Sequence, residues 1–267
     1  MTKIWAMVRK EWGEVFRHKM VLFSTLFMPL MLTAITLVTL YFSRGDGGAG
    51  AMNELKELGD MAAQFAAVCE GLTPAGCNQF IILQQFLALF LLVPSIIPVT
   101  IASYSIVGEK SARTLEPLLA TPITTTQLLG GKALAAAIPG VLATLLGFGI
   151  FVIGAVFLSV DPVLPAKLFS PIWVLGIFTV GPLLAIAGVS LAVMISSRMN
   201  DPRAAEQISV LFMMPVLAVF FGQITGAVTV NTDFMLLLTA ILVLADTLLL
   251  FFATQIFERE NILTRWK

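Results

Sequence analysis

Polar side chains that interrupt long apolar stretches are the residues of this chain best placed to do chemistry. Asp246 lies in the middle of the stretch "VLADTLLLFF", and an ionisable group at such a position is costly enough to indicate a function. The alternative is a neutral or hydrogen-bonded Asp246 packed against a neighbouring helix. Together with Asp246, the polar residues of two other apolar stretches form a candidate transport pathway: Thr25, Thr33, Thr36, Gln84, Gln85, Ser103 and Tyr104. For the threonines, hydroxyl groups that bond back to their own helix are an equally good explanation.

Other kinds of chemistry lack the residues they need. His18 is the only histidine, and with two cysteines it cannot build a zinc site. No phosphate-binding loop of the G-x-x-x-x-G-K-[ST] type occurs, because Gly131-Lys132 is followed by Ala133. No Ser/His/Asp set can be assembled around His18. We therefore expect no enzyme activity, no metal and no cofactor bound by this chain itself.

The amino-acid composition indicates whether the chain is suited to water or to a lipid bilayer. Hydrophobic residues make up 58% of the 267 and charged residues 12%, against roughly 25% charged in an ordinary soluble domain. A protein core cannot absorb this much apolar surface, so the lipid bilayer is the expected partner. The formal net charge is zero, which gives no general attraction to nucleic acid.

The apolar stretches predict an all-α membrane protein with six transmembrane helices. Each stretch is long enough, at about 20 residues or more, to cross a hydrocarbon core of roughly 30 Å. The period-two alternation of a membrane β-barrel is absent. With residues 1–19 set apart, residues 20–267 form one transmembrane domain whose predicted spans are 20–42, 80–107, 133–158, 172–195, 207–229 and 234–257.

Basic residues fix the expected orientation, because cytoplasmic loops of membrane proteins are enriched in Lys and Arg. Thirteen Lys and Arg residues fall in the N-terminal segment, the 108–132 and 196–206 segments and the C-terminal tail. The opposite side has three, namely Arg44, Lys56 and Lys167. We therefore predict a multi-pass protein of the cell membrane with both termini cytoplasmic.

Residues 1–19 have the pattern of an amphipathic helix. Ile4, Trp5, Val8 and Trp12 recur at helical spacing, and the basic residues mostly lie off that stripe. This pattern predicts a helix lying on the inner leaflet, with its tryptophans at headgroup depth. The alternative is a positively charged flank that only sets orientation.

The 43–79 segment is the largest predicted loop on the non-cytoplasmic side. It holds both cysteines, Cys69 and Cys77, where a disulfide is chemically permitted. Two unpaired cysteines are the alternative. A shorter connection follows span five, and part of 215–233 is a candidate re-entrant segment.

The cytoplasmic segment 108–132, "GEKSARTLEPLLATPITTTQLLGGK", is short, charged and rich in turn residues. Thr114 can cap a helical turn that tolerates Pro117 in its first turn. That turn has an apolar face surrounded by charged residues, which suits docking into a groove on a soluble partner. The residues expected to make this contact are Glu109, Lys110, Arg113, Thr114, Leu115, Glu116, Leu118 and Leu119. A solvated interhelical loop is the alternative.

Thr-x-x-Gln and Asp-Pro signals mark two helix starts. Thr124 and Gln127 have the spacing of a capping box. Asp201 followed by Pro202 is typical of an N-cap with proline in the first helical position. The first signal places a helix start before Lys132, so span three begins on the cytoplasmic side.

The 108–132 segment resembles the signature between the second and third spans of type-2 ABC exporter permeases. The family pattern is roughly E-[KR]-E-x-G-T-[LM]-E-x-L-L-x-[TS]-P, followed by a short helix and G-K. Ser111 and Arg113 depart from the pattern, which leaves the details of the contact open. The matching residues are Glu109, Lys110, Thr114, Leu115, Glu116, Leu118, Leu119, Thr121, Pro122, Gly131 and Lys132.

The resemblance implies a permease subunit that works with other subunits. It implies a separate ATP-binding subunit that carries ATP and Mg, and a second permease subunit, identical or different. Residues 109–122 would be the coupling helix, and the N-terminal helix a second contact. Substrate, whether an ion, a drug or a lipid-like molecule, would move outward when the partner hydrolyses ATP.

Two other functions remain open on the sequence. An ion-coupled secondary transporter using Asp246 would need internal repeats around a midplane site, and we find no convincing repeat. A membrane scaffold or assembly subunit that transports nothing is the other alternative.

Overall fold

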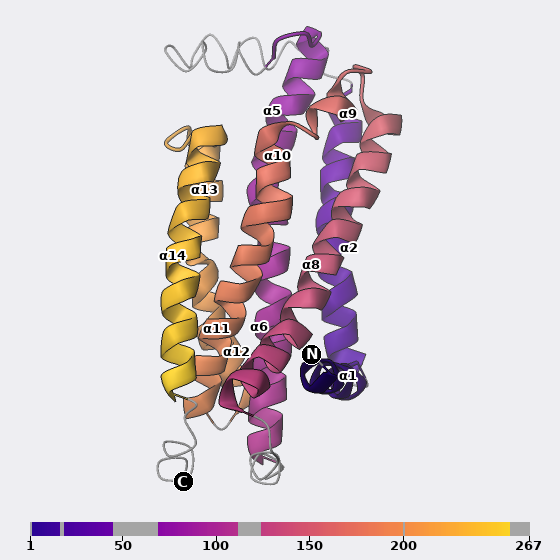
Figure 1. Cartoon of the computed structure of the whole chain (residues 1–267). Coiled ribbons are helices and arrows are strands. Elements are labelled where there is room, and N and C mark those ends of the chain that lie inside the picture. The colour runs from indigo at the N-terminus through magenta and orange to yellow at the C-terminus, as the bar shows by residue number, and fades with distance from the viewer. Residues whose placement is uncertain (1, 17–18, 45–68, 112–123, 200, 257–267) are drawn as a thin grey trace.

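The computed structural model describes residues 2–16, 19–44, 69–111, 124–199 and 201–256. These residues form a bundle of helices that run side by side (Figure 1), with no strand among them. Six helical stretches are long and apolar enough to cross a membrane. The prediction of an all-α membrane protein with six spans is therefore confirmed.

The first half of the bundle holds three spans. Helix α1 is Thr2–Val15 and α2, the first span, is Lys19–Phe42. The second span consists of α5, Pro74–Phe90, and α6, Leu92–Ser111. The third is α8, Thr125–Leu158.

The second half begins with short helices. Helix α9 is Leu164–Lys167, and the fourth span joins α10, Pro171–Leu175, a π-helical segment η1, Gly176–Val180, and α11, Gly181–Arg198. The fifth span comprises α12, Pro202–Val210, a 3₁₀ turn η2, Leu211–Met213, and α13, Met214–Ile224. The sixth is α14, Thr232–Ile256.

The second span is longer than the sequence pattern predicts. It covers 36 residues from Pro74 to Glu109, about 54 Å at 1.5 Å per residue, which exceeds a hydrocarbon core of roughly 30 Å. The predicted boundary at residue 80 missed the first turns of α5, which Thr73 caps by accepting a hydrogen bond from the Gly76 N–H. Leu91 interrupts the span, and Pro94, which has no N–H, cannot donate to the preceding turn.

The α11 helix packs tightly against this interrupted span. An added Cβ on Gly188 would lie 3.1 Å from the backbone oxygen of Ser95, and one on Gly176 would lie 3.0 Å from Leu87. Small residues therefore let the central helices approach closely, as at other membrane helix interfaces. The π-helical segment begins at Gly176, beside the same contact.

Both predicted helix starts are confirmed. Thr124 and Gln127 form a reciprocal capping box at the start of α8. Asp201 accepts a hydrogen bond of 2.9 Å from the N–H of Arg203 and caps α12. The fifth span is helical through η2 to Ile224, and a turn with Gly226 at a φ of 72° connects it to α14.

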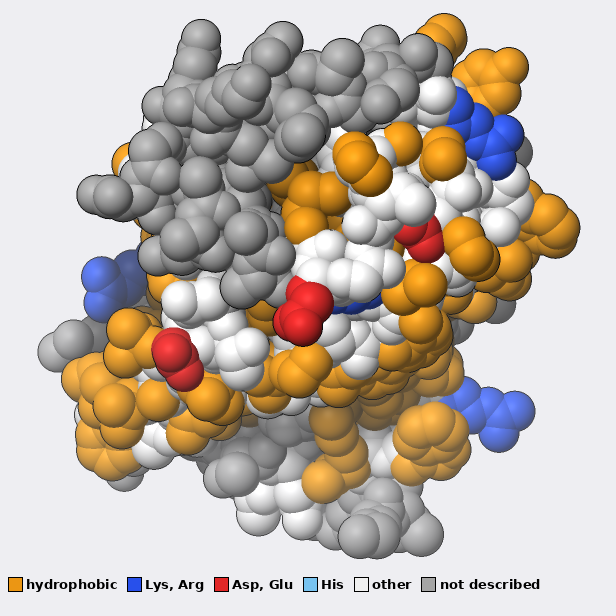
Figure 2. Space-filling model, turned by 90° about the horizontal axis from the view of Figure 1, so that it is seen from above, with side chains coloured by type: hydrophobic (Ala, Val, Ile, Leu, Met, Phe, Trp, Pro, Cys, Tyr) orange, Lys and Arg blue, Asp and Glu red, His pale blue; other side chains and the backbone are white. Residues whose placement is uncertain are grey.

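Polar contacts join the connections at the end of the bundle opposite α1, which we call the disulfide end because Cys69 and Cys77 are bonded there. Asp161 accepts hydrogen bonds from the N–H groups of Thr73, at 2.7 Å, and Val163, at 2.9 Å. The fully buried Gln79 links the end of α2 to the connection after α8, through Leu40 and Val160. Viewed from this end, charged side chains are scattered among hydrophobic ones (Figure 2).

Replacing Asp161 with asparagine is expected to destabilise the disulfide end by roughly 1–2 kcal/mol, because charge-assisted hydrogen bonds are lost. The two backbone N–H donors hold the pKa of Asp161 below its ordinary value. The contribution of the Asp161 carboxylate to folding stability is therefore fully present above the unfolded pKa, near 4. It is lost as the pH falls through the lower pKa of the folded state. In detergent, the wild-type protein should unfold at a higher temperature than Asp161→Asn at pH 7, and this difference should shrink in acid. A difference in unfolding temperature that is the same at all pH values would contradict this account. The control is Asp233→Asn, at an exposed position.

Candidate functional site

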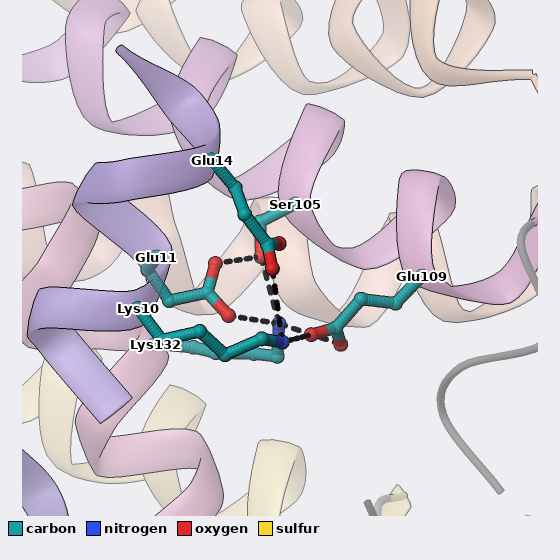
Figure 3. Close-up of polar contacts among 6 residues, drawn as sticks. All are labelled: Lys10, Glu11, Glu14, Ser105, Glu109 and Lys132. Carbon is teal, nitrogen blue, oxygen red and sulfur yellow. Dashed lines mark hydrogen bonds and ion pairs between the residues drawn. The ribbon is translucent and has the colours of Figure 1, made fainter. Parts of the chain in front are cut away.

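Charged side chains from three distant parts of the chain meet where α1 crosses the bundle. Helix α1 is seen nearly end-on in Figure 1, so its axis runs across the spans. It supplies Lys10 and Glu11, while Glu109 comes from the end of α6 and Lys132 from the start of α8 (Figure 3). We call these four residues, with Ser105 of α6, the charged cluster.

Lys132 is the centre of the charged cluster. Its Nζ lies 2.9 Å from Glu11 Oε1 and 2.7 Å from Glu109 Oε2. It also donates to the Ser105 hydroxyl, which in turn donates to Glu11 Oε2. One ammonium group therefore holds two carboxylates that belong to different helices.

The centre of the charged cluster is removed from solvent. Glu11 is 2% exposed, Lys132 4% and Glu109 5%. Taking such groups out of water costs several kcal/mol each, and this cost is offset only where pairing and hydrogen bonds are good. The short distances and the bridging hydroxyl meet that condition, so the three helices are held in one geometry.

Lys10 forms the solvent-facing edge of the charged cluster. Its Nζ lies 2.8 Å from Glu109 Oε1 and 3.6 Å from Glu14 Oε1, and its side chain is 38% exposed. Burial lowers the pKa of Lys10, but the hydrogen bond to Glu109 and the nearby carboxylates outweigh it and raise that pKa. Lys10 therefore stays charged at neutral pH, and its ion pair weakens only as the pH rises through the raised folded pKa.

The sequence of α1 explains how it docks. Met7, Val8, Glu11 and Val15 recur at spacings of three and four residues, and all are buried against the bundle. Gly131 of α8 permits the close approach, since a Cβ there would lie 2.8 Å from Met7 Cγ. Nearby, the Trp12 Nε1–H donates a hydrogen bond of 2.9 Å to the carbonyl oxygen of Ala135.

Comparison with known proteins identifies the family. A profile described as "ABC-2 family transporter protein" matches residues 5–258, nearly the whole chain. The chain belongs to this family. The ABC-2 protein is thus a transmembrane subunit of an ATP-binding cassette transporter, and its family pairs such subunits with an ATP-binding subunit. A search of curated proteins finds no significant match.

The structure places the predicted coupling residues of the ABC-2 protein only in part. Glu109 is buried in the charged cluster, and the backbone of Lys110 lies in the last turn of α6. Arg113, Thr114, Leu115, Glu116, Leu118 and Leu119 lie outside the described residues. Glu109 and Lys132, which lie near the two ends of the 108–132 segment, are in direct contact.

Sequence reasoning missed two members of the charged cluster, Glu11 and Ser105. It treated Lys10 as an orientation signal and Lys132 as part of a motif. The available signal was Glu11 itself, a carboxylate one turn from both Met7 and Val15 on an apolar face. A cation from another helix is the expected partner for such a group. The apolar face of α1 also packs on the bundle, although Trp5 remains 58% exposed.

The predicted pathway residues differ in their burial and in the contacts that they make. Thr33 donates to the carbonyl oxygen of Pro29 at 2.7 Å, and Thr36 to that of Leu32 at 2.8 Å, so both bond back to their own helix. Thr33 also contacts the carbonyl oxygen of Gly147 in α8. Among the others, Thr25 and Ser103 are buried, and Gln84, Gln85 and Tyr104 are half-buried.

Asp246 is a separate buried group on α14. It is 5% exposed, and neither carboxyl oxygen has a hydrogen-bond partner among the described residues. Within the described residues, therefore, Asp246 is not hydrogen-bonded to a neighbouring helix. Nor do the described His, Cys, Asp and Glu residues form a group of three suited to a metal ion.

Proposed function

We propose that this ABC-2 protein is the permease subunit of an exporter, and that a separate subunit binds and hydrolyses ATP with Mg. The charged cluster carries the proposal. It joins α1 rigidly to the ends of α6 and α8, the two helices that flank the predicted coupling segment 109–122. A push on that segment by a partner would then move three helices together.

The proposed orientation has separate support. Thirteen Lys and Arg residues assigned to one side favour cytoplasmic termini and a cytoplasmic charged cluster. An ATP-binding subunit in the cytoplasm would meet that end. A second permease subunit, identical or different, would complete the membrane part, and substrates would be ions, drugs or lipid-like molecules.

Reconstitution of the permease with its ATPase into vesicles tests the proposal. Glu116→Lys is expected to abolish ATP-driven transport while ATP hydrolysis continues, because the contact with the ATPase is altered but the described cluster is intact. Glu109→Gln is expected to reduce the amount of substrate transported per ATP hydrolysed, because the loss of its charge loosens the attachment of α1. Wild-type coupling in both variants would remove the assignment of residues 109–122. Transport that follows an ion gradient without nucleotide would overturn the exporter proposal and favour a secondary transporter.

A further inference from the structure

A cavity lies within the bundle, away from the charged cluster. It has a volume of about 260 Å³ and is lined by residues of α5, α11, η2, α13, α14 and the α13–α14 connection, together with Leu91. Every residue that lines it is apolar. A water molecule needs two to four polar partners to be held in such a site, so the cavity is not built for water.

The lining of the cavity extends along α14. Its lining on α14 runs from Phe234 to Ala245, about 16 Å at 1.5 Å per residue. This length is about half of a hydrocarbon core of roughly 30 Å, which is the depth of one leaflet.

The cavity opens toward the surroundings of the bundle. Pro215 of α13 and Ile241 of α14 line it and are exposed, while Leu91 and Leu242 form its buried wall. Helices α13 and α14 lie at one edge of the bundle in Figure 1. For this chain by itself in a membrane, the gap between these two helices faces acyl chains.

We infer that this cavity holds one acyl chain of a phospholipid from the leaflet at the disulfide end. An apolar chain restores the dispersion contacts that an empty void of this size forfeits. The lining extends along α14 for about the depth of one leaflet, and the exposed residues Pro215 and Ile241 border the cavity. Engineered apolar cavities of roughly 150 Å³ already bind benzene, so this larger one has room for an aliphatic chain.

Photolabelling tests the site on the full chain in nanodiscs. The probe is phosphatidylcholine with a diazirine on its acyl chain, and mass spectrometry maps the labelled residues after irradiation. Wild-type protein is expected to be labelled at the cavity residues Val216 and Leu238 as well as at the exposed Leu244. Labelling at Leu244 alone would overturn the inference.

Two matched variants of α14 sharpen the test. Ala245→Phe fills the cavity, and labelling at Val216 and Leu238 should be lost while labelling at Leu244 persists. Ala240→Phe adds the same ring on the exposed face and should leave the wild-type pattern unchanged. Labelling of Val216 and Leu238 in Ala245→Phe at the wild-type level would overturn the inference. If that variant fails to fold, Ala245→Leu replaces it, and if neither folds, the wild-type pattern decides.

Discussion

Replacing Lys132 with methionine is expected to destabilise the protein by about 3–5 kcal/mol, because the two carboxylates that it neutralises are left buried without compensation. Glu11 and Glu109 both lie within 2.9 Å of its Nζ and are almost inaccessible to solvent. Lys10 reaches Glu109 from the other side but does not contact Glu11 within ion-pair distance in the described structure. Repulsion should therefore release α1 from α6 and α8.

The measurement is thermal unfolding of the detergent-purified variant, followed by size-exclusion chromatography. Lys10→Met is the matched control and should cost at most about 1 kcal/mol, since its side chain is 38% exposed and solvent screens the pair. The triple variant Glu11→Gln, Glu109→Gln, Lys132→Met removes all three charges and should recover most of the loss. The account would be wrong if Lys132→Met and Lys10→Met were equally stable, or if the triple variant were the least stable of all.

The membrane fold was accessible from the sequence because lipid imposes a simple rule. Spans of about 20 apolar residues must form helices that satisfy their own backbone, and all six were predicted. Span ends were less certain, because polar caps and short turns decide them. Thus α5 begins at Pro74, ahead of the apolar window that starts at residue 80.

The charged cluster was only partly accessible, for a physical reason. Glu109 and Lys132 stood out within the 108–132 segment, which is continuous in sequence. Their partner Glu11 lies 121 residues from Lys132, and no local pattern specifies which distant cation a carboxylate will meet. The same limit applies to Gln79, whose amide joins α2 to the connection after α8.

Gly131 offers the sharpest test of whether the docking of α1 matters for transport. A Cβ at Gly131 would lie 2.8 Å from Met7 Cγ and 3.7 Å from the backbone oxygen of Ile4. Leucine at this position must therefore push α1 away from α8, and overpacking of this kind costs about 1–3 kcal/mol. Such a cost shifts the balance between docked and undocked α1 by roughly 5- to 150-fold. Glu11, one turn beyond Met7, would move away from Lys132.

The neighbouring Gly130 provides the control, because nothing lies within 4 Å of a Cβ added there. Gly130→Leu should transport at the wild-type rate, and the added side chain favours the helix itself. In vesicles containing the permease and its ATPase, Gly131→Leu is expected to keep ATP hydrolysis but to lose most transport per ATP. If both leucine variants transport equally, the docked position of α1 is not part of the coupling. If only Gly131→Leu fails, contact between α1 and α8 is needed for force at the end of the bundle that holds the charged cluster to reach the spans.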